Sequence, residues 1–180
     1  MMELSKRFET FSLLQQVMAV LLGCLLITAG AYIEVPMWPV PMTMQTLAIL
    51  LIGAVYTPSL AFVTTMAYLL QGAAGLPVFS GGAGGPAHLL GPTGGYLIGF
   101  IVAACSLSLL VRYVLARKSA LQMGLAMLVA HGFIFVPGVS WLSLFIGTAE
   151  AFYSGFLIFI PGMIFKTVLA LAIIKAVDKA

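Results

Sequence analysis

Lys166 is the side chain whose type and position point most directly to a binding role. It lies inside a predicted last helix that begins near Pro161 and runs to about Val177. Lys175 follows it by nine residues, or about 13 Å of helical rise, so Lys166 is too deep to reach the inner surface. An ammonium at that depth costs at least ~2.5 kcal/mol unless a partner compensates it. An anionic ligand is one such partner, and snorkelling to the outer interface is the alternative.

Four other side chains could contact a ligand. Gln45 can offer two donors and an acceptor to an amide or a urea, or it can bond to a neighbouring backbone carbonyl. Thr43 is better explained as a helix N-cap than as a ligand contact. Phe79 and Tyr96 border a glycine-rich stretch and can supply flat apolar walls, although interface anchoring explains a tyrosine equally well.

The remaining reactive residues are too scattered to form an active site. Nothing pairs His88 or His131 with a second metal ligand or a nucleophile, so structural roles are expected for both. The acids Glu34 and Glu150 cannot be assembled with them into a nucleophile and base. The sequence also lacks zinc-ligand spacing and a phosphate-binding loop. We therefore predict a protein that is not an enzyme, with no catalytic residue, no metal and no cofactor.

The stretch from Leu76 to Tyr96, LPVFSGGAGGPAHLLGPTGGY, interrupts the apolar runs of the chain. Nine glycines and three prolines fall between Gly72 and Gly95, so neither a spanning helix nor a sheet is expected there. Irregular backbone between membrane helices is tolerated only where protein buries it or where it lines a cavity. We expect this stretch to form the wall or lid of a binding site.

The composition is typical of a polytopic membrane protein. Of the 180 residues, 62% are apolar and only 7% are charged, and the mean hydropathy is +1.17, which favours burial in a lipid bilayer. The net charge of +3 is too sparse to indicate nucleic acid binding. We expect one membrane-embedded domain over residues 1–180.

The expected architecture is all-α, a bundle of six transmembrane helices with irregular Gly/Pro-rich outer loops. The helices are expected at 13–33, 44–56, 60–74, 93–111, 120–136 and 161–177. The first exceeds the roughly 20 residues that a crossing needs, and we prefer an uncleaved helix there to a signal peptide. The second and third are short, and short helices flanked by irregular backbone point to a binding site at membrane depth. The alternative is two buried helices pinched by short loops.

The basic residues indicate how the chain is oriented. All but Lys166 fall on one side of a six-helix arrangement, namely Lys6, Arg7, Arg112, Arg117, Lys118, Lys175 and Lys179. By the positive-inside rule, both termini are then cytoplasmic. The loop at 34–42, the glycine-rich stretch and the segment 139–160 share the outer face, where a solute would enter.

Several segments resemble the BioY family, in the same order and with similar spacing. They are PVPMTMQTL at 39–47, YLLQGAAGLPVF at 68–79, GGAGG at 81–85, LLGPTGGYLIGF at 89–100 and, more faintly, FIPGMIFK at 159–166. BioY proteins are the biotin-capturing S components of energy-coupling factor transporters. The resemblance implies high-affinity capture of biotin at the outer face of a bacterial cytoplasmic membrane. A membrane-embedded coupling subunit and two ATPases would then deliver the vitamin to the cytoplasm.

The resemblance also suggests roles for particular residues. Lys166 would hold the carboxylate or a ring oxygen of biotin, and Gln45 would hydrogen-bond the ring or the tail. The other implied ligand contacts are Thr43, Phe79, Gly81, Gly82, Ala83, Tyr96 and Met163. Ala19 and Gly23, small residues on the first helix, would contact the coupling subunit, and packing within this chain's own bundle is the alternative.

Two positions depart from the family pattern. Members usually carry an aspartate where this sequence has Met163, and often an asparagine at Ala83. The missing acid removes an acceptor for urea N–H donors, and a bond to a charged group is worth roughly 1.5–3 kcal/mol. A different class of protein, a membrane scaffold or accessory subunit with no small-molecule ligand, is the alternative function.

Overall fold

The computed structural model describes residues 11–115 and 119–177. The predictions that rest on Lys6, Arg7, Arg117, Lys118 and Lys179 therefore lie outside the described residues. Arg112 and Lys175 are the two described residues of the basic set used for the orientation.

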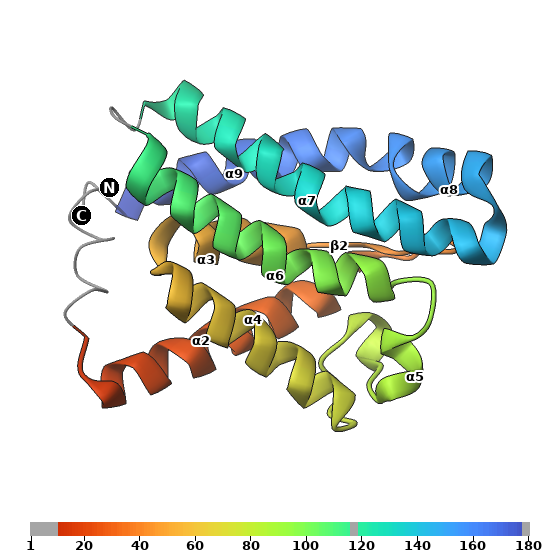
Figure 1. Ribbon diagram of the computed structural model, residues 1–180, viewed down its shortest axis with the longest axis horizontal. Coiled ribbons are helices and arrows are strands. Elements are labelled where there is room, and N and C mark those ends of the chain that lie inside the picture. The colour runs from red at the N-terminus through yellow and green to blue at the C-terminus, as the bar shows by residue number, and fades with distance from the viewer. Residues whose placement is uncertain (1–10, 116–118, 178–180) are drawn as a thin grey trace.

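Among the described residues, six of the helices correspond to the six that were expected. They are α2 (Leu13–Tyr32), α3 (Gln45–Val55), α4 (Pro58–Ala73), α6 (Gly94–Leu109), α7 (Ala120–Ile146) and α9 (Ile160–Val177). In Figure 1, α6 and α3 occupy the middle, with α2 and α4 on one side and α7 and α9 on the other. Five of the six expected helices lie within a few residues of their predicted bounds, and α7 is the exception.

Length and hydropathy identify four segments of the described chain that can cross a membrane. They are Leu13–Tyr32, Gly94–Val114, Ala120–Ile146 and Thr148–Val177. With 11 and 16 residues, α3 and α4 are shorter, as expected from their sequences. The helical membrane architecture is therefore confirmed, whereas six crossings are not confirmed by this criterion.

Local sequence explains where α2 and α4 begin. Ser12 and Gln15 form a capping box at α2, in which the Ser12 hydroxyl accepts from the Gln15 N–H and the Gln15 side chain accepts from the Ser12 N–H. At α4 the Thr57 hydroxyl accepts from the N–H of Leu60. Pro58 follows Thr57 as the first helical residue, where its missing N–H costs nothing.

The predicted end of α7 at Val136 is wrong. The helix continues through Pro137 and ends at Ile146. Proline removes one helical hydrogen bond, but membrane helices tolerate this where neighbouring groups compensate. Gly138 adds a packing reason, because a Cβ at this position would overlap the ring of Tyr96. The straight continuation lets α6 and α7 stay in contact along this stretch.

The predicted N-cap at Thr43 is also wrong. Thr43 belongs to strand β2 (Met42–Thr43), and Met44 is the residue that precedes α3. At α8 (Thr148–Gly155) the cap position is Gly147, with a positive φ of 83° that suits glycine. Glu150 lies in the first turn of α8, where an acid is favourable.

The irregular segments gather at one end of the molecule. Strand β1 (Glu34–Val35) pairs antiparallel with β2, folding the Pro-rich loop back on itself. In Figure 1 this hairpin, α5 (Pro86–Leu89) and α8 lie toward one end, whereas α2 begins and α9 ends at the other. The loop at 34–42, the glycine-rich stretch and the region around α8 thus lie together at one end of the bundle, as expected if they share one face of the membrane.

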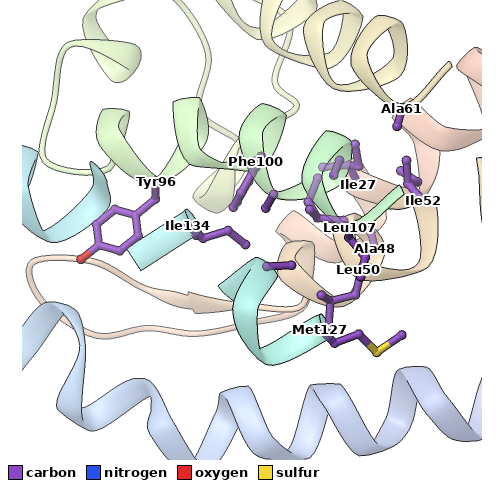
Figure 2. Packing of buried hydrophobic residues seen from close by; sticks show 14 of the residues in the cluster. Ile27, Ala48, Leu50, Ile52, Ala61, Tyr96, Phe100, Leu107, Met127 and Ile134 are labelled. Atoms are coloured by element: carbon purple, nitrogen blue, oxygen red, sulfur yellow. The ribbon is translucent and has the colours of Figure 1, made fainter. Parts of the chain in front are cut away.

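The core between the helices is apolar and tightly packed. Figure 2 shows buried side chains from α3, α6 and α7 directed toward one another, among them Leu50, Phe100 and Ile134. All three are at most 4% exposed. This packing fixes the relative positions of the helices that surround the candidate site.

Candidate functional site

A cavity lies among the first turns of α3, α6 and α9 and the middle of α7, beneath the irregular segments. Its free volume is about 50 Å³. Six of the predicted contact residues line it, namely Thr43, Gln45, Phe79, Tyr96, Met163 and Lys166. They come from four separate stretches of the chain, so the fold brings them together.

Lys166 supplies the only Lys, Arg, Asp or Glu side chain among the described residues that line the cavity. It is 5% exposed. Within the described part of the chain no hydrogen bond or ion pair involves its ammonium group. The side chain does not snorkel to the surface and pairs with no acid of residues 11–115 or 119–177, which leaves a buried cation facing a cavity. Such a cation is suited to an anionic partner.

Gln45 is fixed by a relay of side-chain hydrogen bonds. The Thr43 hydroxyl donates to Gln45 Oε1 at 2.9 Å, and Gln45 Nε2 donates to the Tyr68 hydroxyl. Tyr68 in turn donates to the carbonyl oxygen of Val78 at 2.8 Å. The bond to a neighbouring backbone carbonyl considered for Gln45 is therefore replaced by bonds to two side chains. One amide hydrogen and one oxygen lone pair of Gln45 remain for a further partner.

Phe79 forms an inward-facing wall of the cavity. It is completely buried, packs edge-on against Tyr68 and stacks on His88 with ring centroids 5.1 Å apart. Its ring lies over Gly72, where any Cβ would overlap it. The lack of a side chain at Gly72 thus lets the wall close against α4.

Tyr96 forms a second wall and is held from α8. Its hydroxyl donates to the carbonyl oxygen of Gly155 at 2.9 Å. Its ring packs edge-on against Phe135 of α7. Internal packing, and not anchoring at a membrane interface, therefore accounts for Tyr96.

Gly81, Gly82 and Ala83 do not line the cavity. Phe79 points inward, and the turn that follows it, η2 (Ser80–Gly82), leads the backbone outward through positive φ values of 66° at Gly81 and 67° at Gly82. Gly82 lies beside the ring of Tyr32. Gly81 borders a second, outer hollow, which Glu34 and His88 also line.

His88 lies between the cavity and this outer hollow and lines both. Its Nε2 is 3.3 Å from the hydroxyl oxygen of Thr93. Burial lowers the pKa of His88 from its usual value of 6.5, because a partly dehydrated imidazolium is disfavoured. The ring is therefore neutral near pH 7.

His131 lines the cavity although the sequence predicted only a structural role for it. The side chain is 1% exposed, its Nδ1 lies 3.0 Å from the carbonyl oxygen of Met127, and its ring stacks on Phe135. The pattern His131, Ile134, Phe135 has the i, i+3, i+4 spacing of one helical face. That spacing was the available signal, but it does not say whether the face meets lipid or a cavity.

Ala19 and Gly23 are buried within this chain. The Ala19 carbonyl accepts a hydrogen bond from Tyr56 at 2.8 Å. A Cβ at Gly23 would crowd Thr64 of α4, so the small residues let α2 approach α3 and α4. Gly23 also lies in the floor of an apolar groove between α2, α3 and the end of α9. Packing within the bundle accounts for both residues.

Comparison with known proteins gives a consistent result. The BioY family profile matches residues 2–180. The chain is 40% identical to the "Probable biotin transporter BioY" of Pyrococcus horikoshii, over 88% of this chain and 93% of that protein. It is 36% identical to the "Biotin transporter BioY" of Thermotoga maritima, over 86% of this chain and 90% of that protein.

A solved structure shares the fold. It is the crystal structure of the S-component for biotin from an ECF-type ABC transporter, with a TM-score of 0.81 and 26% sequence identity. The match covers 95% of this chain and 96% of the solved one. With the four long apolar helices, these similarities establish a multi-pass membrane protein. The resemblance seen in the sequence motifs is confirmed, and the chain belongs to the BioY family.

Proposed function

We propose that this protein captures biotin from the outer side of a bacterial cytoplasmic membrane as the substrate-specific S component of an energy-coupling factor transporter. The names of its relatives and the solved S-component for biotin support this class of substrate. The observation that carries the proposal is the Lys166 ammonium, buried at a cavity with no countercharge among the described residues.

Biotin has the groups that this cavity lacks. Its carboxylate or its ureido oxygen would accept from Lys166, and such charge-assisted bonds are about twice as strong as neutral ones. Gln45 would use its free amide hydrogen or lone pair on the ring or the tail, with Thr43 holding it in place. Phe79, Tyr96 and Met163 would enclose the apolar part of the ligand, as in a mostly apolar site with few polar anchors.

Entry of the ligand requires the site to open. A free volume of about 50 Å³ is well below the roughly 300–1,000 Å³ of typical ligand sites. The Pro-rich loop at 34–42 and the turn containing Gly81, Gly82 and Ala83 flank the outer hollow. We assign these segments to a lid that moves on binding, which gives the three small residues a role in closure.

Transport itself needs partners. Capture of biotin makes or breaks no covalent bond, so it supplies no free energy for uptake. That free energy would come from two ATPase subunits, which act through a membrane-embedded coupling subunit. The groove that contains Gly23 is a candidate contact for that subunit, with Ala19 acting indirectly by setting the distance between α2 and α3. In this arrangement α2, α3, α4, α6, α7 and α9 cross the membrane as a single domain, and both termini are cytoplasmic.

The charge of Lys166 provides the direct test. Lys166→Met keeps an apolar stem of similar length and removes the ammonium. In detergent, the affinity for radiolabelled biotin should fall about 10- to 150-fold, the range for losing a hydrogen bond to a charged group. Thermal stability without biotin should not fall, because an unpaired buried charge is lost.

Lys175→Met is the matched control on the same helix, at an exposed position, and should bind as the wild type does. Equal affinity of Lys166→Met and wild type would remove the central assignment. A wild-type protein that retains no biotin, and carries no small molecule by native mass spectrometry, would favour the scaffold alternative.

A further inference from the structure

We propose that His131 is a specificity-determining residue, whose Nε2 accepts a hydrogen bond from a ring N–H of the ligand. The identity of the ligand rests on the function proposed above. The inference about His131 rests on its own geometry.

The hydrogen bond at the other ring nitrogen fixes the tautomer. The Met127 carbonyl oxygen, 3.0 Å from Nδ1, can only accept, so Nδ1 must carry the hydrogen. In the neutral ring, Nε2 is then an acceptor with a free lone pair. A charged ring would have to donate from Nε2 as well, and the described residues provide no acceptor there.

Nε2 is a buried polar atom that has no hydrogen-bond partner in the described part of the chain. The imidazole is 1% exposed and lines the cavity. Buried polar atoms without partners are rare in folded proteins and call for an explanation, such as a ligand group. The stack on Phe135, with ring planes 16° apart, holds the imidazole in one orientation.

His131 Nε2 can only accept, whereas the polar groups around it in the cavity are donors or can act in either sense. Lys166 has only donors. Gln45 Oε1 accepts from Thr43 and keeps one lone pair, but the same amide also offers a donor, and the Tyr96 hydroxyl is engaged with Gly155. The Thr46 hydroxyl is also without a partner among the described residues, but a hydroxyl can rotate to donate or to accept. His131 Nε2 therefore selects specifically for a donor.

The ureido ring of biotin presents two N–H donors, and methylation removes one of them at a time. Wild-type protein should bind biotin at least about 10-fold more tightly than one of the two N-methylated isomers, as expected when a buried acceptor is left unpaired. His131→Phe keeps an aromatic ring to stack on Phe135 and removes the acceptor. In this variant the ratio of the affinity for biotin to the affinity for that N-methylated isomer should shrink at least about fivefold. Biotin itself should bind about 3- to 15-fold more weakly than to the wild type.

Thr46→Val is the control, because it removes a neighbouring polar group of the same cavity and should preserve the wild-type discrimination. Unchanged discrimination by His131→Phe, in protein that binds biotin, would overturn this inference and leave the proposed function standing. Absence of biotin binding by the wild type would overturn the proposed function.

A second measurement guards against misfolding of the variant. In wild-type protein labelled with ¹⁵N-histidine, the unprotonated Nε2 of His131 should change its chemical shift when biotin is added. Biotin should change the Nε2 chemical shift more than the N-methylated biotin isomer that binds more weakly. An Nε2 resonance that does not respond to saturating biotin would refute the proposed hydrogen bond.

Discussion

Gln45 donates from its side-chain amide to the hydroxyl of Tyr68, which joins the first turn of α3 to α4 at the wall of the cavity. Tyr68 passes the interaction on to the carbonyl of Val78, at the beginning of the irregular segment. Gln45, which is proposed to contact the ligand, is therefore linked by hydrogen bonds through Tyr68 to the backbone of Val78, the residue before Phe79.

Tyr68→Phe should weaken both stability and binding. The change leaves a part-buried carbonyl at Val78 and a buried amide hydrogen of Gln45 unpaired, and each such loss costs about 1–3 kcal/mol. We expect a melting temperature in detergent lower by at least about 4 °C and a several-fold weaker affinity for biotin. Tyr113→Phe, at a side chain that is 76% exposed, should change neither quantity. A Tyr68→Phe protein as stable as the wild type would show that the relay contributes nothing.

A methyl group at Gly72 should disrupt the Phe79 wall. The new Cβ would overlap the Phe79 ring, and overpacking of this kind typically costs 1–3 kcal/mol. Gly72→Ala should therefore lower the melting temperature, and a displaced Phe79 should lower biotin affinity as well.

Gly132→Ala in α7 is the matched control, because apart from the adjacent residues and the backbone of its own helix no atom lies within 4 Å of the added Cβ. Alanine is the better helix former, so this variant should be as stable as the wild type or more stable. Equal effects of the two substitutions would contradict a specific role for the contact between Gly72 and Phe79.

Acidification should destabilise the protein through His88. Burial lowers its pKa below the usual 6.5, so its contribution is fully present above about pH 6.5 and is lost as the pH falls through the folded-state value. The groups around it include Glu34 in the outer hollow and Lys166 and His131 in the cavity. His88→Phe preserves the stack on Phe79 but cannot titrate.

The melting temperatures of both proteins should be compared at pH 7.5 and pH 5.5. Because His88 is only partly buried, we expect its contribution to the decrease to be small, no more than about 2–4 °C. His88→Phe should lose less stability on acidification than the wild type does. An identical decrease in both proteins would assign the pH dependence to other groups.

The sequence by itself determined the class of the protein and the positions of most helices. Apolar runs bounded by caps and prolines leave few alternatives in a bilayer, because every backbone polar group there needs a partner. The depth of Lys166 followed from the same reasoning, since the rise of a helix converts residue number into distance. The motifs around Gln45, Phe79 and Tyr96 indicated the family.

The direction in which side chains point was decided only by the tertiary structure. Gly81, Gly82 and Ala83 are adjacent in sequence to Phe79, yet the positive φ values of the turn direct them away from the cavity. Such a change of direction depends on backbone dihedrals that a run of glycines leaves free.

Long-range packing decided the remaining outcomes. Ala19 and Gly23 have the spacing of a helix interface, and the structure places them against this chain's own helices. Pro137 does not end α7, and His131 faces the cavity from the same helix. In each case a one-dimensional pattern identifies a face of a helix. The partner of that face, whether lipid, another helix or a cavity, is set by contacts between residues far apart in sequence.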